Sequence, residues 1–188
     1  MKKAVFLDRD GVINEVLSTR VKFVNKPHEF FLLDGVGEAV RILNDAQIPT
    51  FVVTNQGGVG LGFMKEKALI KVHEKMQEEL AAYGSRVNDI AYCPHKPKAG
   101  CACRKPGSQM LEDLAQRHQI DLTASIMVGD REPDIEAGKK AGCKTIFIGP
   151  ERENTADSNA VFPNLLSAIP WILNNILEEE VEIEKRDY

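Results

Sequence analysis

Short apolar runs alternate along the chain with longer stretches in which apolar residues recur every three or four positions. The runs are rich in β-branched residues and suit buried strands, whereas the longer stretches have the period of amphipathic helices. We predict strands over residues 4–7, 50–53, 89–92, 125–128 and 145–148. We predict helices over residues 36–44, 65–83, 108–118 and 133–141. The alternation is typical of an α/β protein with a doubly wound, mostly parallel sheet.

The rest of the chain adds no obvious second unit. Residues 165–177 form a further apolar stretch, in which Pro170 predicts a break or a late helix start. Residues 178–188 are mostly charged and are expected to form a solvated helix end or a frayed tail. Because no repeat, low-complexity segment or linker divides the sequence, we expect one domain over residues 1–188, with its core over 2–177.

The interval from Gly11 to Gly35 is too short for a second folded unit and too long for a tight turn. We therefore expect a flap beside the functional site and no separate cap.

Composition and charge narrow the classes of function. The 188 residues are 43% hydrophobic and 28% charged, as in ordinary globular proteins. A net charge of -4 gives no electrostatic footprint for a nucleic-acid backbone or an anionic membrane. The N-terminal apolar run is too short for a signal peptide, and no segment has the apolar length of a membrane span. We expect a cytoplasmic monomer that binds neither nucleic acid nor membrane.

Polar sequences follow four of the predicted strands. They are residues 8–11, residues 54–58, the cysteine-containing loop 93–103 and residues 129–134. Ligands of doubly wound sheets bind beyond the carboxyl ends of the strands, so these four segments are expected to meet at one site.

Two aspartates, Asp8 and Asp10, stand together at the end of the first strand. Their carboxylates repel unless a cation or a shared proton reconciles them. Hard oxygen ligands favour Mg²⁺, and we expect its site to comprise Asp8, Asp10 and Asp130, with a backbone carbonyl. An isolated sequence of this kind is more often a turn with capping aspartates, so the prediction of a metal site depends on the residues at the other strand ends.

The loop after the third strand holds Cys93, His95, Cys101 and Cys103. Three thiolates and an imidazole suit tetrahedral Zn²⁺ and fill its coordination, which predicts a structural zinc site. The alternative is a set of buried cysteines beside an inert histidine. The other histidines lack partners at metal-ligand spacing and are expected to have structural roles: His28, His73 and His118.

The motifs, taken in order, resemble those of the haloacid dehalogenase superfamily of phosphatases. The first is the strand and loop at residues 5–11, the second ends at Thr54, the third is Lys105, and the fourth is residues 129–130 followed by Asp134. The resemblance covers residues 2–149. It implies a magnesium-dependent phosphatase that forms an aspartyl phosphate on Asp8, with Asp10 as general acid and base.

The same resemblance implies roles for the other motif residues. Thr54 and Lys105 would hold the transferring phosphoryl oxygens, and Asp130 would complete the Mg²⁺ site. Asp134 would lie behind the metal ligands or fix Lys105.

Three more polar residues adjoin the motifs. Arg104 and Arg131 are placed to bind an anionic group of the substrate, the alternative being solvated surface arginines. Asn55 either lines the pocket or completes a turn.

The cysteine loop followed directly by Arg104 and Lys105 is similar to that of the histidinol-phosphatase and heptose-bisphosphate phosphatase group, whose members lack a cap. The substrate this implies is a small phosphorylated metabolite, with D-glycero-D-manno-heptose 1,7-bisphosphate ahead of histidinol phosphate. Two other classes remain as alternatives. A phosphatase of nucleic-acid ends should have a basic track, and a non-catalytic zinc module would need no paired aspartates.

Overall fold

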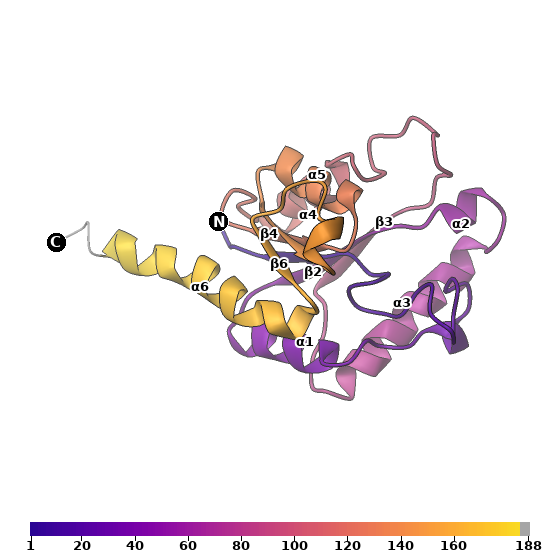
Figure 1. Ribbon diagram of the computed structural model, residues 1–188, viewed down its shortest axis with the longest axis horizontal. Helices are drawn as coiled ribbons and strands as arrows, with labels where there is room; N and C mark the ends of the chain where they lie inside the picture. Colours follow the sequence, from indigo (N-terminus) through magenta and orange to yellow (C-terminus); the bar gives the residue numbers. More distant parts are fainter. Residues whose placement is uncertain (185–188) are drawn as a thin grey trace.

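The computed structural model describes residues 1–184 of the chain, with side chains up to Leu177. Its centre is a parallel sheet of six strands in the order β3-β2-β1-β4-β5-β6 (Figure 1). The strands are β1 (Val5–Leu7), β2 (Thr50–Asn55), β3 (Asp89–Cys93), β4 (Ile126–Gly129), β5 (Lys144–Ile148) and β6 (Ala160–Phe162). The first five confirm the predicted strands, with small shifts at their ends.

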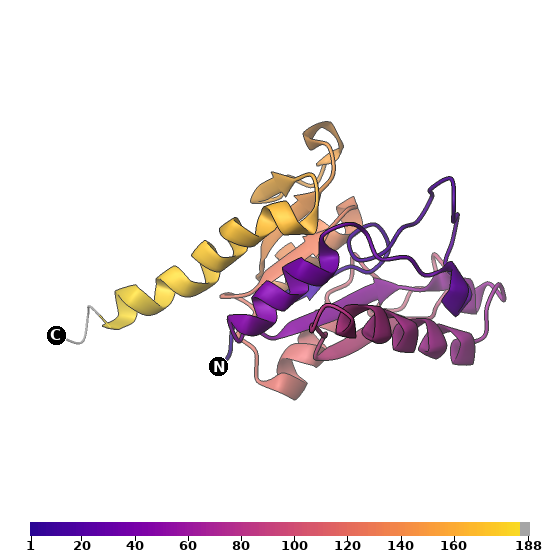
Figure 2. The ribbon, with the colours of Figure 1, turned by 90° about the horizontal axis from the view of Figure 1, so that it is seen from below.

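Helices cover both faces of the sheet, as a doubly wound fold requires (Figure 2). Helices α1 (Val36–Asp45), α3 (Glu66–Ala81) and α6 (Leu165–Glu184) lie on one face. Helices α4 (Gln109–His118) and α5 (Glu132–Ala141) lie on the other. The predicted helices are thus confirmed. Three short elements complete the described chain: η1 (Pro27–Glu29), α2 (Gly57–Gly60) and η2 (Glu151–Glu153).

The central strand β1 shows how the sequence divides the core into two layers. Val5 and Leu7 point into the layer under α1 and α6, whereas Phe6 points into the layer under α4. All three side chains are fully buried. A strand that is buried on both faces is continuously apolar, which explains the run before Asp8.

The strand order reverses at β1, which is flanked by β2 and β4. Leu7 pairs with Val52 on one side and with Val128 on the other. Strand β4 extends to Gly129 and β2 to Asn55, so the three strands end at the same edge of the sheet. The residues that follow them meet at one crevice, where doubly wound folds bind their ligands.

Two features of the C-terminal part differ from the sequence predictions. Strand β6 was not predicted, because it has only three half-buried residues at the edge of the sheet. The break expected at Pro170 is wrong, since α6 runs through it. Asn164 starts this helix by accepting the Ser167 N–H at 2.8 Å, and Pro170 lies on the exposed side. The helix continues to Glu184, and residues 185–188 of the charged tail lie outside the described residues.

Residues 11–35 contain only the short η1 helix and otherwise run as a loop beside the carboxyl ends of the strands (Figure 2). Among residues 1–184, no helix is both long and apolar enough to cross a membrane.

Candidate active site

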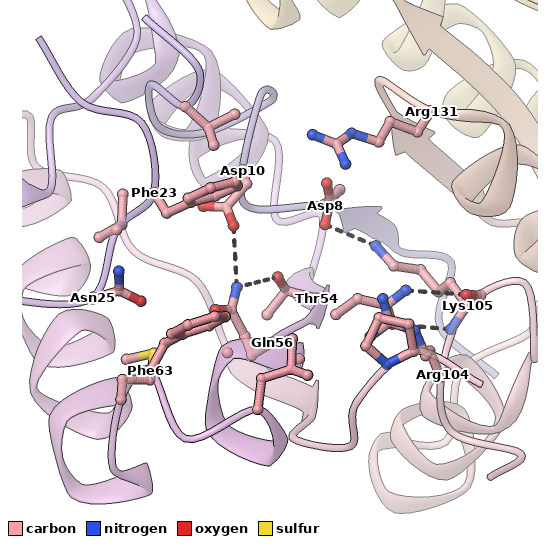
Figure 3. A pocket seen from close by; sticks show the side chains of 18 of the residues that line it. Asp8, Asp10, Phe23, Asn25, Thr54, Gln56, Phe63, Arg104, Lys105 and Arg131 are labelled. Atoms are coloured by element: carbon pink, nitrogen blue, oxygen red, sulfur yellow. Dashed lines mark hydrogen bonds and ion pairs between the residues drawn. The ribbon is translucent and has the colours of Figure 1, made fainter. Parts of the chain in front are cut away.

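Lys105 joins the carboxylates at the centre of the crevice. Its ammonium donates to Asp8 Oδ1 at 2.7 Å (Figure 3). It also donates to the Val53 carbonyl at 2.7 Å and pairs with Asp134 Oδ1 at 2.7 Å. These three acceptors satisfy its three N–H groups. The side chain is buried, and these three bonds fix its position.

Charge is unbalanced around this lysine. Burial raises the pKa of Asp8 well above its ordinary value, Asp134 and Asp130 raise it further, and Lys105 opposes them. Burial and Asp134 raise the pKa of Asp130 to about 6. Burial alone would lower the pKa of Lys105, but Asp134 and Asp8 outweigh it and raise that pKa above its usual value. One buried cation therefore faces three carboxylates, and the Nε of the exposed Arg131 lies 3.9 Å from Asp130 Oδ2.

The cluster of three carboxylates fits a divalent cation. Ligand oxygens of Asp8, Asp130 and Asp134 lie within 4.8 Å of one another, and Asp130 Oδ1 is buried without a hydrogen-bond partner. Asp134 is already occupied by Lys105 and by the Arg131 N–H at 3.1 Å, which leaves Asp8 and Asp130 for the ion. Gly11 makes room, because a Cβ there would lie 2.1 Å from Asp130 Oδ2. Oxygen donors of this kind suit Mg²⁺.

The carboxylate of Asp10 is not part of that group of oxygens, and the expected contribution of Asp10 to the Mg²⁺ site stays a prediction. Its Oδ1 accepts from Arg9 Nη2 at 2.8 Å and from Asn14 Nδ2 at 2.9 Å, and its Oδ2 accepts from Gln56 Nε2 at 3.3 Å. Burial would raise the pKa of Asp10, but Arg9 and Asn14 outweigh it and lower that pKa. The neighbouring buried guanidinium is the physical reason for this orientation.

The end of β2 supplies two polar side chains with different roles, Thr54 and Asn55. Thr54 is buried at the pocket, and its hydroxyl accepts from Gln56 Nε2 at 2.9 Å. Asn55 also lines the pocket, but its amide holds the backbone of Lys105 through bonds of 2.9 and 3.0 Å. Asn55 thus positions Lys105, a task that the sequence analysis did not assign to it.

The crevice opens into a cavity of about 750 Å³. The expected flap contributes to its wall through Val16, Lys22, Phe23, Val24 and Asn25. Arg104 and Arg131 lie on the side of Lys105, whereas Phe23 lies beside Asp10 and Phe63 beside Gln56, on the other side of the cavity (Figure 3). Phe23 is 55% exposed and Phe63 74% exposed. The cavity therefore combines a basic side with an apolar side.

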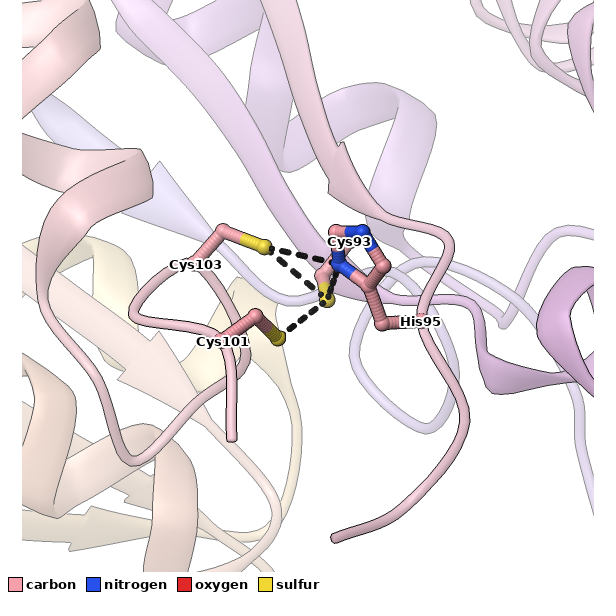
Figure 4. A group of neighbouring side chains, drawn as sticks. All are labelled: Cys93, His95, Cys101 and Cys103. Atoms are coloured by element: carbon pink, nitrogen blue, oxygen red, sulfur yellow. Dashed lines mark hydrogen bonds between the residues drawn. The ribbon is translucent and has the colours of Figure 1, made fainter. Parts of the chain in front are cut away.

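The four predicted zinc ligands come together in the loop after β3 (Figure 4). The Cys93 sulfur lies 3.5 Å from His95 Nδ1, 3.6 Å from the Cys101 sulfur and 3.2 Å from the Cys103 sulfur. Ligands of tetrahedral Zn²⁺ are separated by roughly 3.5–3.8 Å. None of the four cysteines forms a disulfide among the described residues, so the donor set fits zinc.

The cysteine loop packs directly on the segment after β2. The Gln56 N–H donates to the Cys93 carbonyl at 2.8 Å, and the Gly60 N–H donates to the Pro94 carbonyl at 2.8 Å. Arg104 donates to the His95 carbonyl at 3.3 Å. The loop thereby holds one of the two arginines of the cavity.

Two residues behind the site, Arg9 and His73, were not predicted to belong to it. Arg9 is fully buried and contacts both Asp10 and His73. His73, expected to have a structural role, lies 64 positions away in the chain. The only sequence signal was an arginine between two aspartates at a buried strand end, which also suits a surface residue.

A doubly wound sheet that carries the Asp8–Lys105–Asp134 network at its switch point defines the class of haloacid dehalogenase-like hydrolases. In agreement, a family model described as HAD-hydrolase-like matches residues 102–168.

Comparison with known proteins narrows this class. The chain is 40% identical, over 75% of its length and 77% of the relative, to the D-glycero-beta-D-manno-heptose-1,7-bisphosphate 7-phosphatase of Bordetella bronchiseptica. It is 35% identical to the D-glycero-alpha-D-manno-heptose-1,7-bisphosphate 7-phosphatase of Campylobacter jejuni, over 95% and 98% of the two chains. The chain belongs to this family of phosphatases.

A solved structure has the same fold. The D,D-heptose 1,7-bisphosphate phosphatase from B. bronchiseptica, complexed with magnesium and phosphate, superposes with a TM-score of 0.83 at 35% identity. The match covers 92% of this chain and 98% of that one.

Proposed function

We propose that this protein hydrolyses D-glycero-D-manno-heptose 1,7-bisphosphate at the 7-phosphate, giving the heptose 1-phosphate and inorganic phosphate. The observation that carries the proposal is the Asp8–Lys105–Asp134 network beside Asp130, at the base of a cavity with two arginines. Relatives at 40% and 35% identity are 7-phosphatases of this sugar, which supports the choice of substrate and of phosphate.

Asp8 is the nucleophile. Lys105 holds Asp8 Oδ1, so Oδ2 attacks phosphorus while the bond to the sugar oxygen breaks. Asp10 protonates the leaving alkoxide and then takes a proton from the water that hydrolyses the aspartyl phosphate. Asp10 is ionised in the free enzyme, and an arriving phosphate dianion raises its pKa by like-charge repulsion, which favours the protonated form.

Mg²⁺ held by Asp8 and Asp130 supplies neutralisation of the phosphoryl charge, and a related structure contains magnesium and phosphate. Thr54 donates a hydrogen bond to a phosphoryl oxygen, and Lys105 offsets the charge of the transferring group. Asp134 keeps Lys105 in place through their 2.7 Å ion pair.

The rest of the cavity selects the substrate. Arg104 and Arg131 bind the phosphate that is not cleaved, because guanidinium groups match phosphate geometry. Phe23 and Phe63 pack against the carbon skeleton of the sugar. Histidinol phosphate would bring a cationic amine to the arginines, which disfavours it.

The Cys93, His95, Cys101 and Cys103 group binds one structural Zn²⁺ per chain in this proposal. Zinc saturates its coordination there and takes no part in the reaction. It stabilises the loop that carries Arg104 and Lys105.

We further propose that residues 1–188 act as one domain and as a monomer in the cytoplasm. All described strands join one sheet, and none of the four cysteines forms a disulfide among the described residues, which suits a reducing compartment.

The test is kcat/KM with Mg²⁺ for the α and β anomers of the heptose bisphosphate and for histidinol phosphate. We expect a higher kcat/KM for one or both anomers than for histidinol phosphate. Arg104→Ala and Arg131→Ala should each lower kcat/KM on the bisphosphate by about 10–100-fold, the equivalent of a charged hydrogen bond. Arg20→Ala, at an arginine paired with Glu15 outside this cavity, is the matched control. A preference for histidinol phosphate would overturn the substrate assignment.

A further inference from the structure

Arg9, between the two aspartates of the first motif, has no exposed surface. Arginine is almost never fully buried unless its charge is paired. Its Nε and Nη2 donate to the same oxygen, Asp10 Oδ1, at 3.2 and 2.8 Å. Its Nη1 lies 3.3 Å from His73 Nε2. The guanidinium is therefore clamped between a carboxylate and an imidazole.

The imidazole of His73 in this clamp must be an acceptor. Arginine offers only N–H donors, so His73 Nε2 carries no proton and the neutral ring has its proton on Nδ1. Burial and the charge of Arg9 lower the pKa of His73 to about 3, in keeping with a neutral ring. A neutral acceptor orients the guanidinium without neutralising it, so the positive charge of Arg9 acts on Asp10.

A second layer fixes the histidine in turn. His73 is 7% exposed on α3, and its ring lies 5.6 Å from that of Tyr92 on β3. The Tyr92 hydroxyl donates to Glu66 at 2.8 Å, back on α3. The histidine is thus held between two elements of the rigid scaffold.

The two oxygens of Asp10 are treated differently. Oδ1 receives both N–H groups of Arg9 and a third from Asn14 Nδ2 at 2.9 Å. Oδ2 receives one bond, from Gln56 at 3.3 Å, which is long for its type. Asp10 also lines the cavity. One oxygen is saturated and the other retains its capacity for a proton.

We propose that Arg9, whose guanidinium is held by His73, is a positioning residue. It fixes Asp10 through Asp10 Oδ1 and so makes Asp10 Oδ2 the oxygen that transfers the proton. The proposal rests on the proposed function of Asp10 as general acid and base. Proton transfer requires a heavy-atom distance of about 2.6–3.2 Å, so a carboxylate that can rotate loses part of its effect.

The experiment compares two leaving groups. A sugar alkoxide needs a proton to leave, whereas 4-nitrophenolate leaves without one. kcat/KM covers substrate binding and the steps up to the phosphorylation of Asp8. It excludes the hydrolysis of the aspartyl phosphate, so only the role of Asp10 as an acid enters it. The variants are Arg9→Lys, His73→Leu and His73→Gln. Asp10→Asn serves as the positive control and Arg20→Lys as the matched control.

Arg9→Lys cannot contact both Asp10 and His73, since an ammonium lacks the fork of a guanidinium. We expect it to lower kcat/KM on the heptose bisphosphate by about 10–100-fold, within the range of general acid catalysis, and on 4-nitrophenyl phosphate by less than about threefold. His73→Leu should show the same pattern, and His73→Gln, which keeps an acceptor, should recover part of the loss. Arg20→Lys should change neither rate.

Partial unfolding lowers kcat/KM on both substrates by the same factor. The ratio of the two kcat/KM values therefore separates a positioning role from a structural effect. Equal losses on both substrates, or a His73→Gln variant no better than His73→Leu, would overturn the positioning role. If the wild type cleaves sugar monophosphates but not the heptose bisphosphate, the proposed substrate fails and the comparison proceeds with a monophosphate. A wild type without phosphatase activity on any of these esters would overturn both proposals.

Discussion

Asp8 stands among charges that make its ionised form costly. Burial and the carboxylates of Asp134 and Asp130 raise its pKa, and only Lys105 stabilises its negative charge. This arrangement suits a nucleophile, because the carboxylate of Asp8 loses its own negative charge when its oxygen bonds to phosphorus. The network thus relates the reactivity of Asp8 to a local loss of stability.

Asp8→Asn should therefore abolish turnover without weakening the fold. An amide keeps the shape of the side chain but cannot accept the phosphoryl group, and it removes one of three crowded carboxylates. We expect no detectable phosphate release, with a thermal midpoint in chelator equal to or above that of the wild type. Calorimetry and a phosphate-release assay are the measurements. Residual turnover of the purified variant would contradict the covalent mechanism.

The residues of the site differ in how readily the sequence predicts them. Asp8 and Asp130 each follow a buried strand and Thr54 lies near the end of β2. Parallel strands end at one edge, so the meeting of these residues could be predicted. The task of Asn55 could not, because it depends on a contact with a backbone 50 positions away. The same is true of the pairing of Arg9 with His73.

At the scale of elements, the short helix α2 and the cysteine loop form one unit. Gly60 approaches the loop so closely that a Cβ would lie 2.6 Å from the Lys96 nitrogen and 2.8 Å from the Pro94 oxygen. Both neighbours are backbone atoms, which cannot rotate away. The glycine is thus required by the packing of the loop, and α2 itself was too short to be predicted.

Gly60→Ala should displace the cysteine loop. Overpacking of this kind costs about 1–3 kcal/mol, so we expect a lower free energy of unfolding together with faster loss of zinc to a chelator. Gly58→Ala is the matched control, since its Cβ would have no neighbour closer than 3.6 Å. Metal analysis and urea unfolding measure the two effects. Equal behaviour of the two variants would show that the loop does not depend on this contact, and absence of zinc from the wild type would contradict the zinc site.

At the scale of the whole molecule, the α/β class and the helices on both faces of the sheet could be predicted from the sequence. Strand β6 at the edge of the sheet and the continuation of α6 through Pro170 could not. Helix patterns were readable because their buried residues recur regularly, as with Val36, Val40 and Leu43 of α1. Strand β6 has only three residues, half buried, and its pairing with β5 is a long-range contact. The break predicted at Pro170 was wrong because a helix tolerates a proline at an exposed position, and this exposure cannot be read from the sequence.

If the chain is one domain, α6 and the sheet should unfold together. The molecule has a single tryptophan, Trp171, which lies on α6 and packs against the layer that contains α1. Its fluorescence therefore reports on α6, whereas far-ultraviolet circular dichroism reports on all helices. We expect the two signals to give coincident urea transitions in the presence of Zn²⁺ and Mg²⁺.

Ile172→Ala sharpens this test, because the side chain is fully buried in the same layer. Its loss should lower the free energy of unfolding by about 2–5 kcal/mol and move both transitions by the same amount. Leu177→Ala, on the same helix but 40% exposed, should change it by less than about 0.5 kcal/mol. A fluorescence transition that moves while the circular dichroism transition stays in place would mean that α6 unfolds by itself, and the chain would then comprise more than one cooperative unit.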